Sequence, residues 1–95
     1  MAAYLIADIE VTNPAGYDEY RRQVPATVEK YGGRFVVRGG AVETLEGDWG
    51  PQRVVVLEFP TMDALKRWYN SAEYKPLIAL RQKNGSGSII AVQGA

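Results

Sequence analysis

The sequence has no cysteine and no histidine among its 95 residues. Without cysteine there is no disulfide framework, no thiolate nucleophile and no cysteine-bound metal or iron–sulfur cluster. Without histidine there is no Ser-His-Asp triad, no imidazole base and no histidine ligand for a metal or a haem. We therefore expect no metal and no cofactor. Any acid–base chemistry falls to Asp, Glu, Tyr, Lys or Arg.

An excess of charge of either sign is also missing. Eleven Lys and Arg residues balance eleven Asp and Glu residues, so the formal net charge is zero. A neutral chain has no overall field that attracts nucleic acid or an anionic membrane, and we expect neither partner. No apolar run approaches the roughly 18 residues of a membrane span, and the N-terminus lacks the basic flank and cleavage site of a signal peptide. A cytoplasmic location is the default expectation.

The composition is that of one globular domain over residues 1–95. Hydrophobic residues make up 46% of the chain and charged residues 23%, an ordinary balance for a folded protein. The length suffices for one domain and not for two. The core of such a short chain is modest, so a partner surface would add stability.

Hydrophobic periodicity predicts the order βαββαβ, with a further short helix after the second one. Alternating side chains indicate strands, and apolar residues three and four apart indicate helices. Pro25 removes one hydrogen bond from the first helix, which we expect to kink rather than to split. The predicted elements are a strand over residues 4–11, a helix over 14–32, strands over 34–45 and 53–59, helices capped by Thr61 and Ser71, a loop over 84–87 and a strand over 88–92.

This order predicts a ferredoxin-like α+β sandwich with both helices on one face of the sheet. We expect the first and third strands side by side and parallel at the centre. The other face has no helix to cover it, and a second copy packed over it would form a dimeric α+β barrel. Alternation places on this uncovered face Ile6, Asp8, Val36, Arg38, Val54, Val56, Glu58 and either Ile89 or Ile90.

Four separated stretches are similar to a known family. They are residues 31–40 (YGGRFVVRGG), 45–49 (LEGDW), 58–60 (EFP) and 68–74 (WYNSAEY). In this order they resemble the domain-of-unknown-function family numbered 1330, in the dimeric α+β barrel superfamily, over essentially the whole chain. The resemblance implies a ferredoxin-like protomer that forms a homodimer through its sheet. Relatives in that superfamily include cofactor-independent monooxygenases, lactone isomerases and haem proteins, which use a cavity between sheet and helices. The absence of histidine excludes the haem function here.

Three charged residues interrupt otherwise apolar strand faces: Asp8, Arg38 and Glu58. A buried charge needs a partner or solvent. In one interpretation Arg38 holds an anionic substrate while Glu58 or Asp8 acts as the general base. In the other, Arg38 is buried against Asp8, Glu10 or Glu58 in a structural ion-pair network at the dimer interface. A close Arg38–Glu58 pair would make Glu58 a poorer base and favour the second interpretation.

Aromatic side chains on the helices complete the candidate site. We expect most of them in the core, but a tyrosine hydroxyl that opens on the cavity would donate to an oxyanion. Ser71 is expected to cap a helix, because there is no histidine to activate it as a nucleophile. The candidate substrate-binding residues are Arg38, Tyr69, Tyr17, Trp68 and Tyr74, beside Glu58 and Asp8 as catalytic candidates.

Two functions remain open on the sequence. The first is binding of a small oxygenated or aromatic compound in a cavity between sheet and helices, with isomerisation or oxidation of that compound without a cofactor. The second is a non-catalytic dimeric module, structural or interacting, whose polar residues are architectural. Both are compatible with a homodimer, and neither needs nucleic acid or a membrane.

Overall fold

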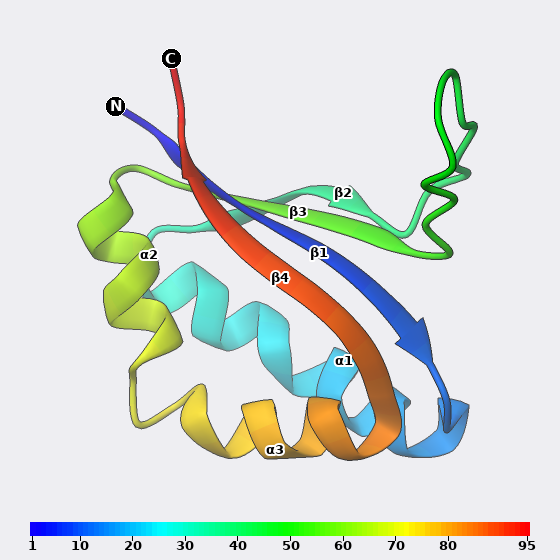
Figure 1. The fold of residues 1–95 in the computed structure, drawn as a ribbon. Helices are drawn as coiled ribbons and strands as arrows, with labels where there is room; N and C mark the ends of the chain where they lie inside the picture. Colours follow the sequence, from blue (N-terminus) through cyan, green and yellow to red (C-terminus); the bar gives the residue numbers. More distant parts are fainter.

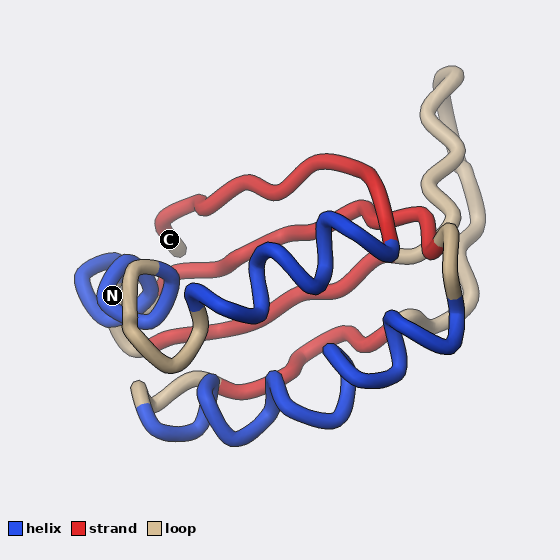
Figure 2. The backbone as a smooth tube through the Cα atoms, turned by 90° about the horizontal axis from the view of Figure 1, so that it is seen from below, coloured by secondary structure: helices blue, strands red, loops and turns tan.

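The computed structural model describes all residues, 1–95, as four strands and three helices. The strands are β1 (Ala3–Val11), β2 (Arg34–Arg38), β3 (Val54–Phe59) and β4 (Gly85–Gln93), and the helices are α1 (Pro14–Lys30), α2 (Met62–Tyr69) and α3 (Lys75–Asn84). The strands form one sheet in the order β2-β3-β1-β4, and the helices lie on one side of it (Figure 1). Seen from below, α1 and α3 run side by side across that face (Figure 2). The ferredoxin-like α+β fold is confirmed.

The two central strands are β1 and β3, as expected, but they run antiparallel and not parallel. The crossover through α1 makes β1 and β2 run in the same direction. β3 returns from β2 and inserts between these two strands, so it must run antiparallel to both. The expected alternation of β1 is confirmed, because its helix-facing side chains are buried: Ala3, Leu5, Ala7 and Ile9.

α1 continues through Pro25 as one helix and stops at a glycine pair. Gly32 has a φ of 80°, in the left-handed region that glycine adopts without steric cost. The Gly33 N–H donates to the Val28 carbonyl at 3.0 Å. A Cβ on Gly33 would lie 2.6 Å from the Phe59 ring, so only glycine allows the chain to pass over the core here.

The second strand is much shorter than predicted. It ends at Arg38 because Gly39, with a φ of 70°, turns the chain away from β3. Residues 40–50 are exposed and have no partner strand. They form a loop that rises on the side of the sheet opposite the helices, drawn in green in Figure 1. A β-bulge does occur in β2, but it lies between Phe35 and Val37 and not at the expected glycines.

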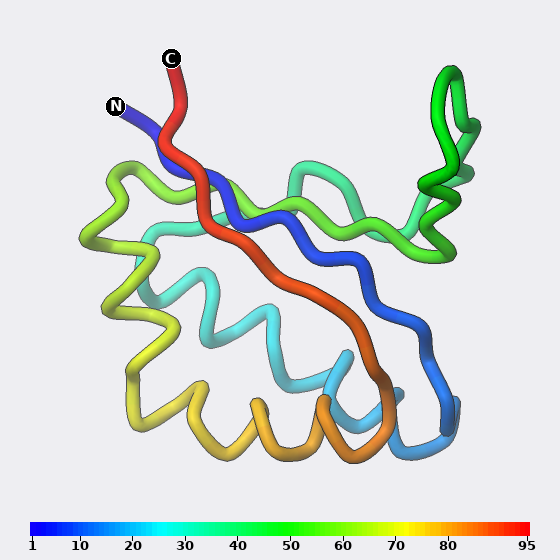
Figure 3. The backbone as a smooth tube through the Cα atoms, viewed as in Figure 1, coloured from blue at the N-terminus to red at the C-terminus, as the bar shows by residue number.

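The predicted loop over residues 84–87 is wrong, because α3 leads directly into β4. The carbonyl of Asn84 accepts hydrogen bonds from the backbone N–H groups of Thr12 and Asn13, at 2.9 and 3.1 Å, which ties the helix end to β1. Gly87 then pairs with Ile9. The strand therefore begins earlier than its apolar residues indicate, and it brings the two termini together (Figure 3).

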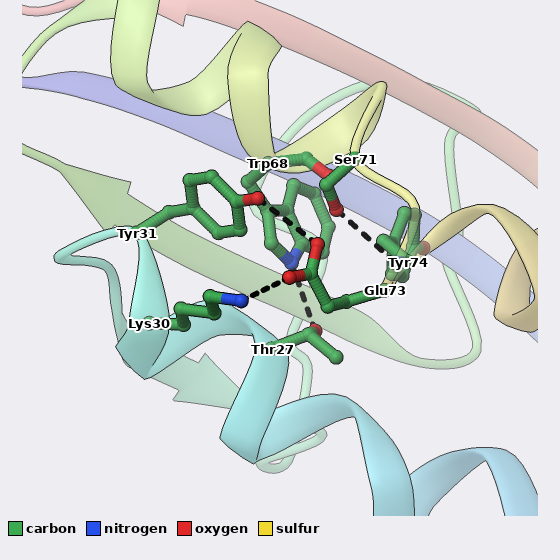
Figure 4. Close-up of polar contacts among 7 residues, drawn as sticks. All are labelled: Thr27, Lys30, Tyr31, Trp68, Ser71, Glu73 and Tyr74. Carbon is green, nitrogen blue, oxygen red and sulfur yellow. Dashed lines mark hydrogen bonds and ion pairs between the residues drawn. The ribbon is translucent and has the colours of Figure 1, made fainter.

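Side-chain hydrogen bonds join the end of α1 to the connection between α2 and α3 (Figure 4). The indole N–H of Trp68 donates to Thr27 Oγ1 at 3.0 Å. Glu73 forms an ion pair with Lys30 and accepts a hydrogen bond from the Tyr31 hydroxyl at 3.0 Å. The hydrogen bond from Lys30 is the main reason that the pKa of Glu73 falls to about 2.

The predicted cap at Thr61 is present, but Ser71 does not cap α3, because the N-cap position of that helix is Tyr74 and no side chain caps it. The backbone N–H of Ala64 donates to Thr61 Oγ1 at 3.0 Å at the start of α2. Ser71 Oγ accepts from the Tyr74 N–H at 3.1 Å and donates to the Trp68 carbonyl at 2.7 Å, which shapes the turn before α3. None of the three helices has the length and hydropathy that a bilayer crossing requires.

Candidate functional site

A cavity of about 40 Å³ lies between the helix-facing side of the sheet and the helices. At roughly 10–15 Å³ per water it holds about three or four water molecules. Every strand and every helix contributes to its wall, so it sits at the centre of the fold. Its lining consists of Leu5, Ala7, Ile9, Tyr17, Tyr20, Arg21, Val24, Phe35, Arg38, Arg53, Val55, Leu57, Trp68, Tyr74, Arg81 and Ile89.

Aromatic rings form much of this wall. Trp68 and Tyr74 lie with their ring centroids 4.0 Å apart, and Tyr20 meets the edge of Tyr74 at 6.3 Å. Tyr17 continues the row, 5.3 Å from Tyr20. Such rings pack well against a flat apolar or aromatic ligand.

The tyrosine hydroxyls converge on a buried arginine. The hydroxyls of Tyr20 and Tyr74 are 2.7 Å apart, and Arg81 Nη1 donates to the Tyr74 oxygen at 2.9 Å. These residues are 9%, 1% and 7% exposed, respectively. Burial raises the pKa of both tyrosines, so both hydroxyls keep their protons at neutral pH.

Arginine is the only charged residue type in the lining: Arg21, Arg38, Arg53 and Arg81 occur there, and no Asp or Glu does. Arg53 Nη1 approaches the Tyr17 hydroxyl at 3.5 Å, and the Arg38 guanidinium stacks 4.0 Å from the centroid of the Phe35 ring. Only Arg21 has a carboxylate partner, Asp18, at 3.3 Å. The cavity therefore offers hydrogen-bond donors and positive charge.

The structure corrects the expected position of Arg38. Simple alternation put Arg38 on the uncovered face with Val36, but the bulge at Val36 reverses the alternation. As a result Arg38 pairs with Val55 and lines the cavity on the helix side. Arg38 is exposed at the rim of that cavity and belongs to none of the four ion pairs, so the expected burial of Arg38 against a carboxylate is wrong.

Glu58 and Asp8 lie on the uncovered face, as expected, and outside the cavity. Glu58 pairs with Arg34 at 2.6 Å and accepts from the Tyr4 hydroxyl at 3.0 Å. The Arg34 hydrogen bond is the main cause of the lowered pKa of Glu58, which makes this carboxylate a weak base. Asp8 accepts a hydrogen bond from the Trp49 indole at 3.0 Å. Neither position supports a base for chemistry inside this cavity.

The remaining candidate residues lie partly in the cavity and partly outside it. Tyr17, Trp68 and Tyr74 line the cavity together with Arg38, whereas Tyr69 lies beside β4 at an outer groove. No group of three or more acidic side chains gathers where it could hold a metal ion. The sequence reasoning did not select the other polar lining residues: Tyr20, Arg21, Arg53 and Arg81.

The sequence does contain an indication that one of these residues, Arg81, belongs to the site. Arg81 falls on the same helical stripe as Tyr74 and Leu77, and a charge within an apolar stripe indicates either a paired or a functional side chain. By contrast, the face of the sheet on which Arg38 lies depends on the bulge at Val36, and no residue type in the sequence indicates a bulge there.

The order of the elements and the antiparallel four-stranded sheet place the protein among ferredoxin-like α+β proteins. The family model described as "Domain of unknown function (DUF1330)" matches residues 2–95, and the chain belongs to that family. The comparison with curated proteins found no match.

Solved structures support the fold at low sequence identity. A protein of unknown function from Rhodopseudomonas palustris, RPA0582, is 18% identical with a TM-score of 0.79, over 99% of this chain and 82% of that one. SnoaB, a cofactor-independent oxygenase from Streptomyces nogalater, is 14% identical with a TM-score of 0.67, over 99% and 93%. A putative antibiotic biosynthesis monooxygenase from Caulobacter crescentus CB15 is 19% identical with a TM-score of 0.61, over 99% and 90%.

Proposed function

We propose that this protein binds a small oxygenated or aromatic compound in the cavity between sheet and helices, and that it does so as a homodimer. The observation that supports binding is the lining itself, in which aromatic rings surround a few convergent polar groups, the usual make-up of a ligand site. Arg38, Tyr17, Trp68 and Tyr74 are the proposed binding residues. Glu58 and Asp8 are not assigned a role in the cavity.

The uncovered sheet face supports the homodimer. Ile90 and Val92 are 58% and 42% exposed on β4, next to the half-buried Ile6 and Val56. The loop of residues 40–50 rises on the same side (Figure 1) and would flank a second copy. A stable interface buries about 800 Å² per partner, and a largely apolar sheet face of this kind is suited to that role.

The dimer is tested by light scattering. The parent should show twice the chain mass at micromolar concentration, and Ile6→Asp should show the monomer mass because it buries a charge in the interface. The control is Ala79→Asp, an equivalent change at an exposed position on α3. A parent that is a stable monomer would contradict the homodimer.

Ligand binding is tested through Trp68, which lines the cavity and is 1% exposed. The variant Trp49→Phe removes the other tryptophan, which is 64% exposed in the loop. In this variant a panel of small phenols, carboxylates and lactones should include compounds that change the Trp68 emission saturably and raise the melting temperature. If no compound in the panel does so, the binding function is wrong.

One observation favours the alternative, a non-catalytic structural module: the cavity of about 40 Å³ is smaller than a benzene ring requires. Under that alternative the polar lining residues only stabilise the fold, and no panel compound binds. Turnover is a separate question, examined with the same panel by product analysis and oxygen uptake for each compound that binds.

A further inference from the structure

The buried pair of Tyr20 and Tyr74 has one more hydroxyl proton than it has hydrogen-bond acceptors in the protein. Tyr20 and Tyr74 carry two O–H protons, and the single hydrogen bond between them uses one. The only other hydrogen bond to either hydroxyl comes from Arg81, which donates to Tyr74 and so consumes no hydroxyl proton. One proton at this site therefore has no acceptor in the protein.

Arg81 determines which hydroxyl keeps the spare proton. A hydroxyl that accepts from a cation is polarised and becomes a stronger donor. Tyr74 accepts from Arg81, so the favoured order of donation runs from Arg81 to Tyr74 and from Tyr74 to Tyr20. The free O–H then belongs to Tyr20, which lines the cavity and is more than nine-tenths buried.

The positive charge of the cavity is also uncompensated. The chain has seven arginines, of which Arg21, Arg22 and Arg34 form ion pairs. Four have no carboxylate partner, and three of those four line this one cavity: Arg38, Arg53 and Arg81. A buried guanidinium without a counter-ion is costly, and an anion beside it would remove much of that cost.

We infer that the ligand is a small organic anion with an apolar or aromatic body, such as a carboxylate, a phenolate or an enolate. Its oxyanion accepts the free hydrogen bond of Tyr20 and faces Arg53 and Arg38, while its body packs against Trp68. This inference rests on the proposed binding function and specifies the ligand class for the same cavity.

Space for the ring comes from the rim. Arg38 is exposed and stacks on Phe35, Arg53 is half-buried between Tyr17 and Gly39, and neither guanidinium forms an ion pair. Their outward rotation enlarges the cavity without moving the sheet or the helices. Because the guanidinium groups stay at the mouth, they remain close to an anion that enters.

The test compares two probes of the same shape, benzoate and benzamide, by calorimetric titration at neutral pH. Benzoate is an anion there, and benzamide is neutral. A hydrogen bond to a charged group contributes about 1.5–3 kcal/mol, so benzoate should bind at least about tenfold more tightly than benzamide.

Two variants locate the effect. The double variant Tyr20→Phe with Tyr74→Phe should weaken benzoate binding by at least about tenfold, because it removes both hydroxyl protons, whereas Tyr20→Phe alone would free the Tyr74 O–H to donate instead. Its control is Tyr31→Phe, which removes a hydroxyl that bonds Glu73 away from the cavity. Arg53→Gln should also weaken benzoate and leave benzamide unchanged, with Arg67→Gln, an exposed arginine on α2, as its control.

The outcomes separate the two proposals. Equal affinity for benzoate and benzamide, or a double variant Tyr20→Phe with Tyr74→Phe that binds benzoate as tightly as the parent, would overturn the anion inference and leave cavity binding intact. Equal losses in Arg53→Gln and Arg67→Gln would show that benzoate responds only to surface charge, and would also overturn it. Failure of both probes to bind the parent, with failure of the wider panel, would overturn the binding function as well.

Discussion

Gly16→Ala should destabilise the protein, because the added Cβ would clash with Asn84. A second substitution, Asn84→Ala, should remove that clash. A Cβ on Gly16 would lie 2.0 Å from Oδ1 and 2.4 Å from Cγ of Asn84. Asn84 is 3% exposed, and its Nδ2 donates to the Leu80 carbonyl at 2.8 Å, so its side chain cannot turn into solvent to make room. This contact joins the start of α1 to the end of α3. Gly16 precedes Tyr17 and Asn84 lies three residues after Arg81, so the contact is close in sequence to two residues of the cavity wall.

Two opposing effects set the magnitude. Overpacking costs about 1–3 kcal/mol, and displacement of Asn84 loses a hydrogen bond of about 1 kcal/mol. Replacement of glycine by alanine in a helix returns about 0.5–1 kcal/mol. Gly16→Ala should therefore lower the free energy of unfolding by about 1–3 kcal/mol, or about 4–8 °C in melting temperature per kcal/mol.

The sign should reverse when Asn84 is shortened. In the Asn84→Ala background the amide group that would clash with the new Cβ is absent. Gly16→Ala should then raise the free energy of unfolding by about 0.5–1 kcal/mol. The free energies of unfolding of the parent, both single variants and the double variant are measured by urea denaturation. If Gly16→Ala destabilises both backgrounds equally, or stabilises the parent, the packing described for these two residues is wrong.

The remaining predictions concern the turn before α3 and the two tryptophans. The pKa of Glu73 is about 2 in the folded protein against 4.5 ordinarily, so its contribution to stability is present above about pH 4.5 and is lost as the pH falls towards 2. The melting temperature should therefore fall more steeply with acid in the parent than in Glu73→Gln. Identical pH profiles of the two proteins would contradict this. Ser71→Ala removes the acceptor of the Tyr74 N–H and should cost about 1 kcal/mol by urea denaturation, whereas no loss would argue against this hydrogen bond in the turn. Acrylamide should quench the emission of Trp49 and leave that of Trp68, and equal quenching would show that the cavity wall is open.

Local patterns predicted most of the fold. The alternation of β1, the glycines after α1 and the cap at Thr61 are each signalled by residues that act on their own neighbourhood. The errors arose where long-range contacts decide. The extent of β4 depends on pairing of its glycines with β1, and the end of β2 depends on the absence of a partner strand after Gly39.

The candidate site was predictable only in part, because a strand face is a property of register. One extra residue at Val36 moves Arg38 from the uncovered face to the cavity. That shift separates Arg38 from Glu58 and Asp8, and it turns an expected ion-pair network into a cavity whose charged residues are all arginines. Tyr17, Trp68 and Tyr74 were identified from the sequence because helical spacing places them on the buried side whatever the register of the sheet.

The most direct test of the central claim, a small anion bound between sheet and helices, is the arginine side-chain NMR spectrum during a benzoate titration. The Nε–H signals of Arg38, Arg53 and Arg81 should shift together and saturate with one binding constant, and benzamide should leave them in place. Shifts confined to Arg22, Arg34 and Arg67, which lie outside the cavity, would contradict the account.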